Sequence, residues 1–200
     1  MEAALRPLPF AWPWFLVFWP VFAWVFSAEA KVMRGTPMIG PAPKEDRGSL
    51  RVVLFGFGLA MFAAFFCPFA ARWAALPGHP LAWFAIGLAL MVAGTLLRRH
   101  CFRVLGAFFT GAVTIQKEHR VIDVGAYRYV RHPSYTAGLL IVLGVALAGG
   151  NWLGALVAFA LAYLAYWHRA RIEEQALLAA LGPQYARFMA TRNRFIPFLP

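Results

Sequence analysis

Long apolar runs dominate this chain and are separated by shorter polar segments. Five runs approach the roughly 20 residues that a helix needs to cross a bilayer. None of them contains Lys, Arg, Asp or Glu, and they cover Leu8–Phe26, Val52–Ala71, Leu81–Leu97, Tyr135–Gly150 and Trp152–Trp167. The pattern predicts an all-α integral membrane protein with about five transmembrane helices.

Prolines, glycines and aromatic residues refine this prediction. Three prolines and four tryptophans in the first run favour a kinked helix with aromatic side chains at both membrane interfaces. Gly149, Gly150 and Asn151 join the last two runs, which predicts a tight helical hairpin whose charged ends can continue beyond the lipid. Residues 31–49 contain three glycines and three prolines and are typical of an irregular loop. Residues 99–116 fit either an interfacial amphipathic helix or an extension of the third helix.

Composition and charge support a membrane protein and predict its orientation. Hydrophobic residues make up 62% of the chain and charged residues only 14%, against roughly half and a quarter in soluble domains. The net charge is +11, and seventeen of the nineteen Lys and Arg residues lie in residues 27–51, 98–131 and 169–200. Positive segments stay in the cytosol. We therefore predict an N-terminus outside, with the C-terminus and active site in the cytosol, in the cytoplasmic (inner) membrane.

Two other interpretations of these segments conflict with the charge pattern. Ala28-Glu29-Ala30 resembles a signal-peptide cleavage site, but removal of the first helix would reverse the charge asymmetry of the remaining loops. The basic residues are spread over three segments, which fits topology and contact with anionic membrane lipids rather than nucleic acid.

The chain is expected to divide near residue 97. Residues 1–97 would form three N-terminal transmembrane helices, and residues 98–200 a catalytic region with the last two helices and the C-terminal tail. Cys67 and Cys101 offer neither a disulfide framework nor a zinc ligand set, and the histidines are scattered. No metal site is predicted.

The first segment with candidate chemistry runs from Gly125 to Tyr135. Pro133 suits the first turn of a helix. Arg128, Arg131 and His132 lie at the same place, where unpaired backbone N–H groups and the helix dipole favour an anion. The segment predicts a receptor for a carboxylate or phosphate, and an interfacial basic and aromatic belt is the alternative.

The second segment lies at the end of the fifth predicted helix and contains Arg169, Glu173 and Glu174. One glutamate can pair with Arg169, and the other must point elsewhere. Because the last two helices form a hairpin, this segment should lie close to the basic helix start. A cation-rich helix start beside a carboxylate suits a zwitterionic amino-acid group, and a solvated Arg–Glu pair is the alternative.

The order and spacing of these motifs resemble the isoprenylcysteine carboxyl methyltransferase family, which has relatives among the phospholipid N-methyltransferases. The resemblance covers about residues 98–200. It rests on His119-x5-Gly125-Ala-Tyr127-x3-Arg131-His-Pro-Ser-Tyr135, Arg169-x3-Glu173-Glu174, Leu181-Gly-x2-Tyr185 and Arg194-x-Ile-Pro197.

The resemblance implies a cofactor, S-adenosylmethionine (SAM), and a role for particular residues. His132 and the helix start would receive the methionyl carboxylate of SAM, Glu173 would receive its ammonium, and Arg169 would face the methyl acceptor. The residues implied to surround SAM are Gln116, His119, Arg120, Val121, Ile122, Tyr127, Arg131, His132, Pro133, Ser134, Tyr135, Glu173 and Glu174.

The resulting hypothesis is an integral-membrane SAM-dependent methyltransferase. Its acceptor would be a small lipophilic or membrane-embedded molecule that arrives from the bilayer, and the closest activity is isoprenylcysteine carboxyl O-methylation. SAM would arrive from the cytosol beneath a lid formed by residues 176–200. The first alternative is a phospholipid N-methyltransferase, followed by an NADPH-dependent sterol-reductase-like enzyme and a non-catalytic membrane protein.

Overall fold

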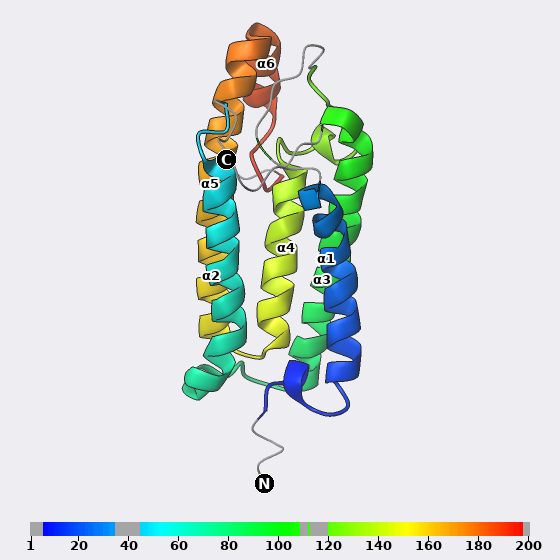
Figure 1. The fold of residues 1–200 in the computed structure, drawn as a ribbon, viewed down its shortest axis with the longest axis vertical. Helices are drawn as coiled ribbons and strands as arrows, with labels where there is room; N and C mark the ends of the chain where they lie inside the picture. The colour runs from blue at the N-terminus through cyan, green and yellow to red at the C-terminus, as the bar shows by residue number, and fades with distance from the viewer. Residues whose placement is uncertain (1–5, 35–44, 109–111, 113–119, 198–200) are drawn as a thin grey trace.

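The computed structural model describes residues 6–34, 45–108, 112 and 120–197, and these form an elongated bundle of helices (Figure 1). The long helices run up and down along one axis, and a short sixth helix follows. They are α1 (Phe15–Arg34), α2 (Ser49–Ala70), α3 (Pro80–Leu105), α4 (Pro133–Ala148), α5 (Trp152–Leu181) and α6 (Pro183–Thr191). Short 3-10 helices are η2 (Leu8–Phe10), η3 (Arg72–Ala74), η4 (Gly106–Phe108) and η5 (Gly125–Arg128). The predicted all-α class is confirmed.

Each predicted apolar run forms a helix, but three helices differ from the predicted bounds. The first run is split into η2 and α1, because α1 begins only after Pro13. α1 then continues to Arg34, so the prediction of an irregular loop was wrong for residues 31–34, which contain neither glycine nor proline. Residues 99–105 extend α3, and Gly106, with a positive φ of 52°, ends it. α5 continues past the apolar run to Leu181, as expected for the charged end of the hairpin.

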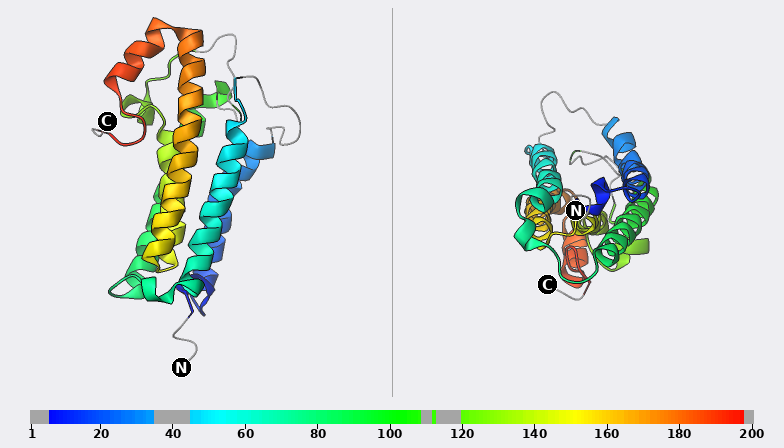
Figure 2. Two further views of the ribbon diagram at one scale, coloured as in Figure 1. Left: turned by 90° about the vertical axis from the view of Figure 1, so that its left-hand side faces the viewer. Right: turned by 90° about the horizontal axis from the view of Figure 1, so that it is seen from below.

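α4 is the central helix of the bundle. Most of its side chains are buried, and it packs against α3 on one side and against α5 and α2 on the others (Figure 2). Small residues allow the helix backbones to approach closely, as is common between membrane helices. A Cβ atom added to Gly144 of α4 would lie 2.6 Å from the Gly87 carbonyl oxygen of α3. A Cβ atom added to Gly94 of α3 would lie 2.7 Å from the Ala137 carbonyl oxygen of α4.

α2 also packs closely along α5 through a small residue. A Cβ atom at Gly56 would lie 2.8 Å from the Cβ atom of Ala165, whereas one at Gly58 would meet no atom within 4 Å. Close packing at this Gly-Phe-Gly sequence therefore involves Gly56 and not Gly58. α1 instead meets α2 through aromatic rings, such as the stacked pair of Trp19 and Phe65.

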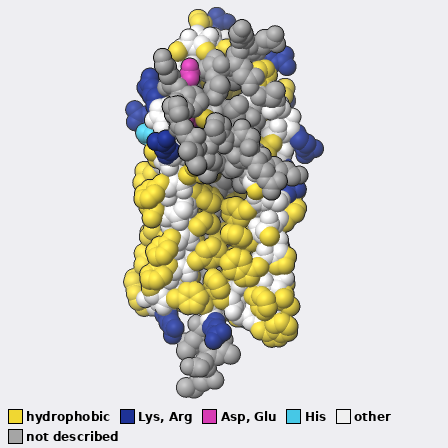
Figure 3. Space-filling view, in the orientation of Figure 1, with side chains coloured by type: hydrophobic (Ala, Val, Ile, Leu, Met, Phe, Trp, Pro, Cys, Tyr) yellow, Lys and Arg dark blue, Asp and Glu magenta, His cyan; other side chains and the backbone are white. Residues whose placement is uncertain are grey.

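The surface has the polarity of a membrane protein. Figure 3 shows hydrophobic side chains over the lower part of one face, with most of the Lys and Arg side chains around its upper part. α2 and α3 are each long and apolar enough to cross a membrane, and Phe15–Ser27 and Pro133–Ala148 are shorter apolar segments. We call the end at which α2 and α4 begin and α3 and α5 end the charged end.

Asn151 holds the opposite end of the bundle together. It is only 2% exposed, its Nδ2 donates to the Ala71 carbonyl oxygen (2.7 Å), and its Oδ1 accepts from the N–H of Gly154 (2.8 Å). The second bond caps the N-terminus of α5, and the first ties the α4–α5 hairpin to the end of α2. The α2–α3 and α4–α5 hairpins therefore keep a fixed register relative to each other. The same register aligns their ends at the charged end.

The glycine contacts give a testable prediction about packing. Gly144→Ala should lower the midpoint of thermal unfolding in detergent, by an amount equivalent to about 1–3 kcal/mol, because the added methyl group meets backbone atoms that cannot rotate away. Gly58→Ala is the matched control, since it also adds one methyl group to a helical glycine but meets no neighbour. Equal midpoints for the two variants would contradict the close packing of α3 and α4.

Candidate active site

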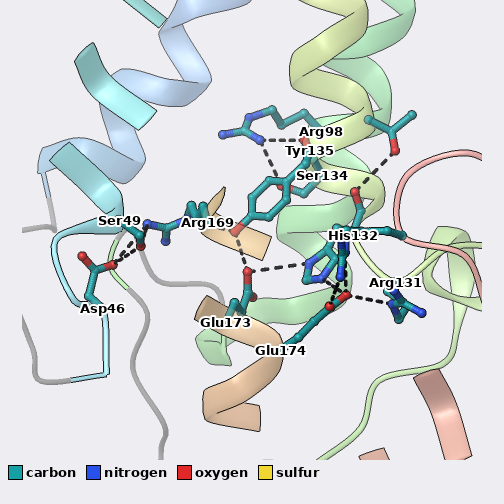
Figure 4. Close-up of polar contacts among 12 residues, drawn as sticks. Asp46, Ser49, Arg98, Arg131, His132, Ser134, Tyr135, Arg169, Glu173 and Glu174 are labelled. Carbon is teal, nitrogen blue, oxygen red and sulfur yellow. Dashed lines mark hydrogen bonds and ion pairs between the residues drawn. The ribbon is translucent and has the colours of Figure 1, made fainter. Parts of the chain in front are cut away.

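The polar residues highlighted by the sequence meet at the charged end. The segment before α4 brings Arg131 and His132 to the C-terminal half of α5, which carries Arg169, Glu173 and Glu174 (Figure 4). Pro133 begins α4 and is buried, as predicted for a helix-starting proline. The α4–α5 hairpin thus positions the two motifs together, which confirms that part of the sequence-based argument.

Glu174 is the centre of this cluster. Its side chain is 4% exposed, and Oε1 accepts a hydrogen bond from Arg131 Nε (2.8 Å) and lies 3.1 Å from His132 Nε2. Arg194 belongs to residues 192–197 after α6, which we call the C-terminal segment. It donates to Oε2 (2.6 Å) and Oε1 (3.1 Å) of Glu174. One buried carboxylate therefore joins α5, the start of α4 and the C-terminal segment.

The charge state of Glu174 follows from these contacts. Burial alone would raise the pKa of its carboxyl group, but hydrogen bonds from His132 and Arg194, together with the charges of His132 and Arg131, lower this pKa to about 2. Glu174 is therefore ionised at neutral pH.

The C-terminal segment also uses the backbone donors in front of α4. The N–H groups of Arg131 and His132 donate to the carbonyl oxygens of Asn193 (2.8 Å) and Arg194 (3.0 Å). Thr136 Oγ1 donates to the Phe195 carbonyl oxygen (2.6 Å). The anion receptor predicted at this helix start is thus already filled from within the chain, by Glu174 and by these carbonyl groups.

Glu173 differs from its neighbour in both exposure and partners. Its side chain is 31% exposed, its Oε2 accepts from the Tyr135 hydroxyl (2.5 Å), and the same oxygen lies 3.6 Å from His132 Nδ1. Successive residues of a helix point about 100° apart, so Glu174 faces the interior while Glu173 faces a more open side. Glu173 is the glutamate of the pair that can receive a cationic ligand.

Arg169 is connected to Glu173 indirectly. Its Nε donates to the Tyr135 hydroxyl (2.9 Å), and that hydroxyl donates to Glu173. Its Nη1 donates to Asp46 Oδ1 and Ser49 Oγ, both at 3.2 Å. The Arg169 side chain is 7% exposed. Arg169 therefore pairs with Asp46 at the start of α2, and the simple solvated Arg–Glu pair that the sequence allowed does not describe it.

Three stacked rings support this arrangement. The rings of His132 and Tyr135 are 5.1 Å apart and inclined by 7°, and those of Tyr135 and Tyr166 are 4.9 Å apart and inclined by 14°. Phe195 packs edge-on against Tyr135. The stack fixes the direction of the Tyr135 hydroxyl, and with it the link between Arg169 and Glu173.

Two other tyrosines adjoin the glutamates. Tyr127 in η5 is buried, and burial, together with the nearby groups of Cys101 and Glu173, raises the pKa of its hydroxyl. Tyr185 in α6 is 4% exposed, and burial, followed by the charges of Glu173 and Glu174, raises its pKa. Both hydroxyl groups are neutral at physiological pH.

The other predicted cofactor residues are distributed more widely. Ser134 is buried, and both its carbonyl oxygen and its Oγ accept from Arg98 Nη1 at 2.7 and 2.9 Å. Val121 and Ile122 are half-buried, whereas Arg120 is exposed. Gln116 and His119 lie outside the residues that the structure describes.

Sequence reasoning missed three partners in this cluster. Asp46, Ser49 and Arg98 were not predicted, although all three are bonded to predicted residues. The spacing of Asp46 and Ser49, just before an apolar run, is a signal for a helix start, but nothing local indicates that it meets Arg169, 123 residues later.

Comparisons with known proteins agree with this geometry. A model of the phospholipid methyltransferase family matches residues 82–184, just over half of the chain. Protein-S-isoprenylcysteine O-methyltransferase B of Arabidopsis thaliana is 27% identical over 127 residues, which cover 62% of this chain and 64% of the relative. The corresponding enzyme of Schizosaccharomyces pombe is 28% identical over 115 residues, covering 56% and 49%. The chain belongs to the phospholipid methyltransferase family.

A solved structure extends the likeness to the whole fold. It is that of the eukaryotic intramembrane Ras methyltransferase ICMT (isoprenylcysteine carboxyl methyltransferase), which matches with a TM-score of 0.57 at 20% identity. The match covers 92% of this chain and 70% of that one. With the apolar helices, it shows that the chain is an integral membrane protein of this fold. The matches to the two named relatives span about half to two thirds of their length.

The contacts of Glu174 predict a pH dependence of stability. A carboxyl group with a pKa that is lower in the folded than in the unfolded chain stabilises the fold above its unfolded pKa, and this contribution is lost as the pH falls through the folded pKa. For Glu174 the loss should run from about pH 4.5 to about pH 2. Glu174→Gln should lose about 3–5 kcal/mol of stability at pH 7, because it leaves buried cations unpaired.

Unfolding of wild type and Glu174→Gln in detergent between pH 2 and pH 7 would check this. The difference in stability between them should shrink below pH 4.5, and Glu45→Gln, at an exposed position, should behave as wild type at pH 7. A constant difference between wild type and Glu174→Gln over the whole range would contradict the assignment of Glu174 as the buried carboxylate.

Proposed function

We propose that this protein is an integral-membrane SAM-dependent methyltransferase that esterifies the carboxylate of a lipophilic acceptor such as an S-prenylated cysteine. The observation that carries the proposal is the link from Arg169 through the Tyr135 hydroxyl to Glu173. It holds a site for an anion and a site for a cation side by side, where the apolar bundle meets its charged end.

The residues fit the ammonium end of SAM. The Glu173 carboxylate lies on the more open side of α5. Its nearest described partners are the Tyr135 hydroxyl and the His132 imidazole rather than an arginine. An ammonium group would complete its set of charge-assisted hydrogen bonds. His132 fits the methionyl carboxylate less well than the sequence suggested, because it already lies between two glutamates. We therefore propose that His132 orients the carboxylates of Glu173 and Glu174.

Methyl transfer from SAM requires little of the protein beyond alignment of the two reactants. When bound, SAM supplies a methyl group that its sulfonium has already activated. Transfer of this methyl group from sulfur to a carboxylate oxygen of the acceptor would give a methyl ester and S-adenosylhomocysteine, with no proton to be moved by the protein. The protein contributes by orienting the reactants and excluding water.

Arg169 is the proposed residue for the acceptor. A guanidinium group can hold one oxygen of the acceptor carboxylate while the other oxygen faces the methyl group. Its buried position at the end of the apolar part of α5 suits an acceptor whose hydrocarbon portion stays among the helices. In our proposal the acceptor arrives from the bilayer, while SAM arrives from the cytosol beneath α6 and the C-terminal segment, in the cytoplasmic membrane with the N-terminus outside.

The direct test measures methyl transfer in detergent or liposomes. Purified protein is incubated with SAM labelled on the methyl group and either N-acetyl-S-farnesylcysteine or phosphatidylethanolamine. Label released as methanol by base identifies a methyl ester, whereas stable label in the lipid headgroup identifies N-methylation. Ester formation is expected. Label only in the headgroup would replace our proposal with a phospholipid N-methyltransferase.

Glu173 gives a prediction about binding alone. Calorimetric titration with S-adenosylhomocysteine should show binding to wild type, and Glu173→Gln should weaken it by about 10- to 100-fold, since a hydrogen bond to a charged group contributes roughly 1.5–3 kcal/mol. Glu45→Gln makes the same chemical change at an exposed position and should bind as wild type. Equal affinities for all three proteins would remove Glu173 from the cofactor site.

Arg169 should separate acceptor use from cofactor binding. Arg169→Gln is expected to lower kcat/KM for N-acetyl-S-farnesylcysteine by about 10- to 100-fold, while the affinity for S-adenosylhomocysteine changes by less than about threefold. The prediction fails if both quantities fall together in protein that remains folded, because Arg169 would then belong to the cofactor site or to the scaffold.

A further inference from the structure

Asp46 forms an ion pair inside the proposed acceptor site from a part of the chain that no motif covers. Its side chain is fully buried, and its Oδ1 lies 3.2 Å from Arg169 Nη1. It precedes α2, far outside residues 82–184, which match the family model. Figure 4 shows Asp46 and Ser49 on one side of Arg169 and Tyr135 on the other.

The start of α2 holds this carboxylate in place. Oδ1 accepts from Ser49 Oγ (2.9 Å), and Oδ2 accepts from the backbone N–H of Leu50 (3.1 Å). The N–H of Ser49 also donates to the Asp46 carbonyl oxygen (2.8 Å). A carboxylate at a helix N-terminus is stabilised by the helix dipole and the unpaired N–H groups. These contacts hold the Asp46 side chain in a fixed position, with Oδ1 directed at Arg169.

Two rigid anchors then define the position of the Arg169 guanidinium group. Nε is fixed by the Tyr135 hydroxyl, which belongs to the ring stack of α4, and Nη1 by Asp46 and Ser49 at the start of α2. A buried ion pair adds little net stability compared with a well-packed apolar pair. Its main effect here is on where the guanidinium lies and how much of its charge an acceptor experiences.

That charge matters for a carboxylate that must react. A fully uncompensated guanidinium group would bind the acceptor tightly and would also hold electron density away from the attacking oxygen. Uniform binding of this kind lowers KM without raising kcat. A neighbouring carboxylate offsets part of the charge, weakens binding of the acceptor and leaves its oxygen more reactive.

We propose that Asp46 is a positioning residue of the acceptor site, which fixes the Arg169 guanidinium group and tempers its charge so that a bound carboxylate remains nucleophilic. The inference rests on the proposed function and deepens it. It also gives the N-terminal half a defined role, because acceptor use would depend on the start of α2 as well as on α5.

The test compares kcat and KM for N-acetyl-S-farnesylcysteine in wild type, Asp46→Asn and Ser49→Ala. Asp46→Asn should lower KM by about threefold or more, because a repulsive charge is removed, and lower kcat by about tenfold, because the guanidinium is misplaced. Ser49→Ala removes a neutral contact to the same Nη1 atom, and its KM should not fall. An unchanged kcat and KM in Asp46→Asn, or a lower kcat with unchanged KM, would overturn the proposal.

A second comparison covers the case in which Asp46→Asn does not fold. Asp46→Asn is added to Arg169→Gln, which leaves a neutral pair in place of the ion pair. If Asp46 acts through Arg169, kcat in the double variant should equal that of Arg169→Gln within about twofold. A further fall of about tenfold would show that Asp46 acts independently of Arg169.

Titration with S-adenosylhomocysteine separates this inference from the proposed function. A wild type that neither binds it nor methylates the probe overturns the proposed function, and the role of Asp46 with it. A wild type that does both, beside an Asp46→Asn variant with unaltered kinetics, overturns the role of Asp46 alone.

Discussion

The buried carboxylate of Glu174 is the interaction on which the charged end depends. It accepts from Arg131 and Arg194 and contacts His132, so three basic side chains from two distant segments meet on one group of α5. In a buried setting such a carboxylate is stable only when its partners stay in place. The same contact therefore fixes the start of α4 and closes the C-terminal segment over it.

Fixing the start of α4 determines the geometry next to it. His132 lies between both glutamates, its ring stacks on Tyr135, and the Tyr135 hydroxyl bridges Arg169 and Glu173. Two adjacent glutamates thus have different tasks because a helix turns about 100° per residue. Glu174 pairs with the arginines around it, whereas Glu173 keeps a more exposed carboxylate, which in our proposal receives the ammonium group of SAM. A single glutamate here could not both pair with the buried arginines and keep an exposed carboxylate.

The sequence predicts much of this fold because membrane helices are set by their own composition. Apolar length, a helix-starting Pro133 and the Gly149-Gly150-Asn151 turn are local signals, and the helices form where those signals lie. Pairing of charged groups is not local. Nothing near Glu174 indicates that Arg194 would bind it, and the anion receptor predicted before α4 is filled by the chain itself. Asp46 was overlooked for the same reason, since its partner belongs to another helix.

Asp46 lies beside Arg169 because α2 packs along α5. Gly56 lets α2 approach Ala165 closely, and the start of α2, two turns away, then lies beside the turn of α5 that carries Arg169. Backbone contact between small residues is rigid, so the position of Asp46 follows from helix packing rather than from a flexible loop. The part of the site that would meet SAM is built by α4, α5 and the C-terminal segment. In our proposal the acceptor side also includes Asp46 from the N-terminal half, so changes at the start of α2 should alter acceptor use while the remainder of the cluster keeps its contacts.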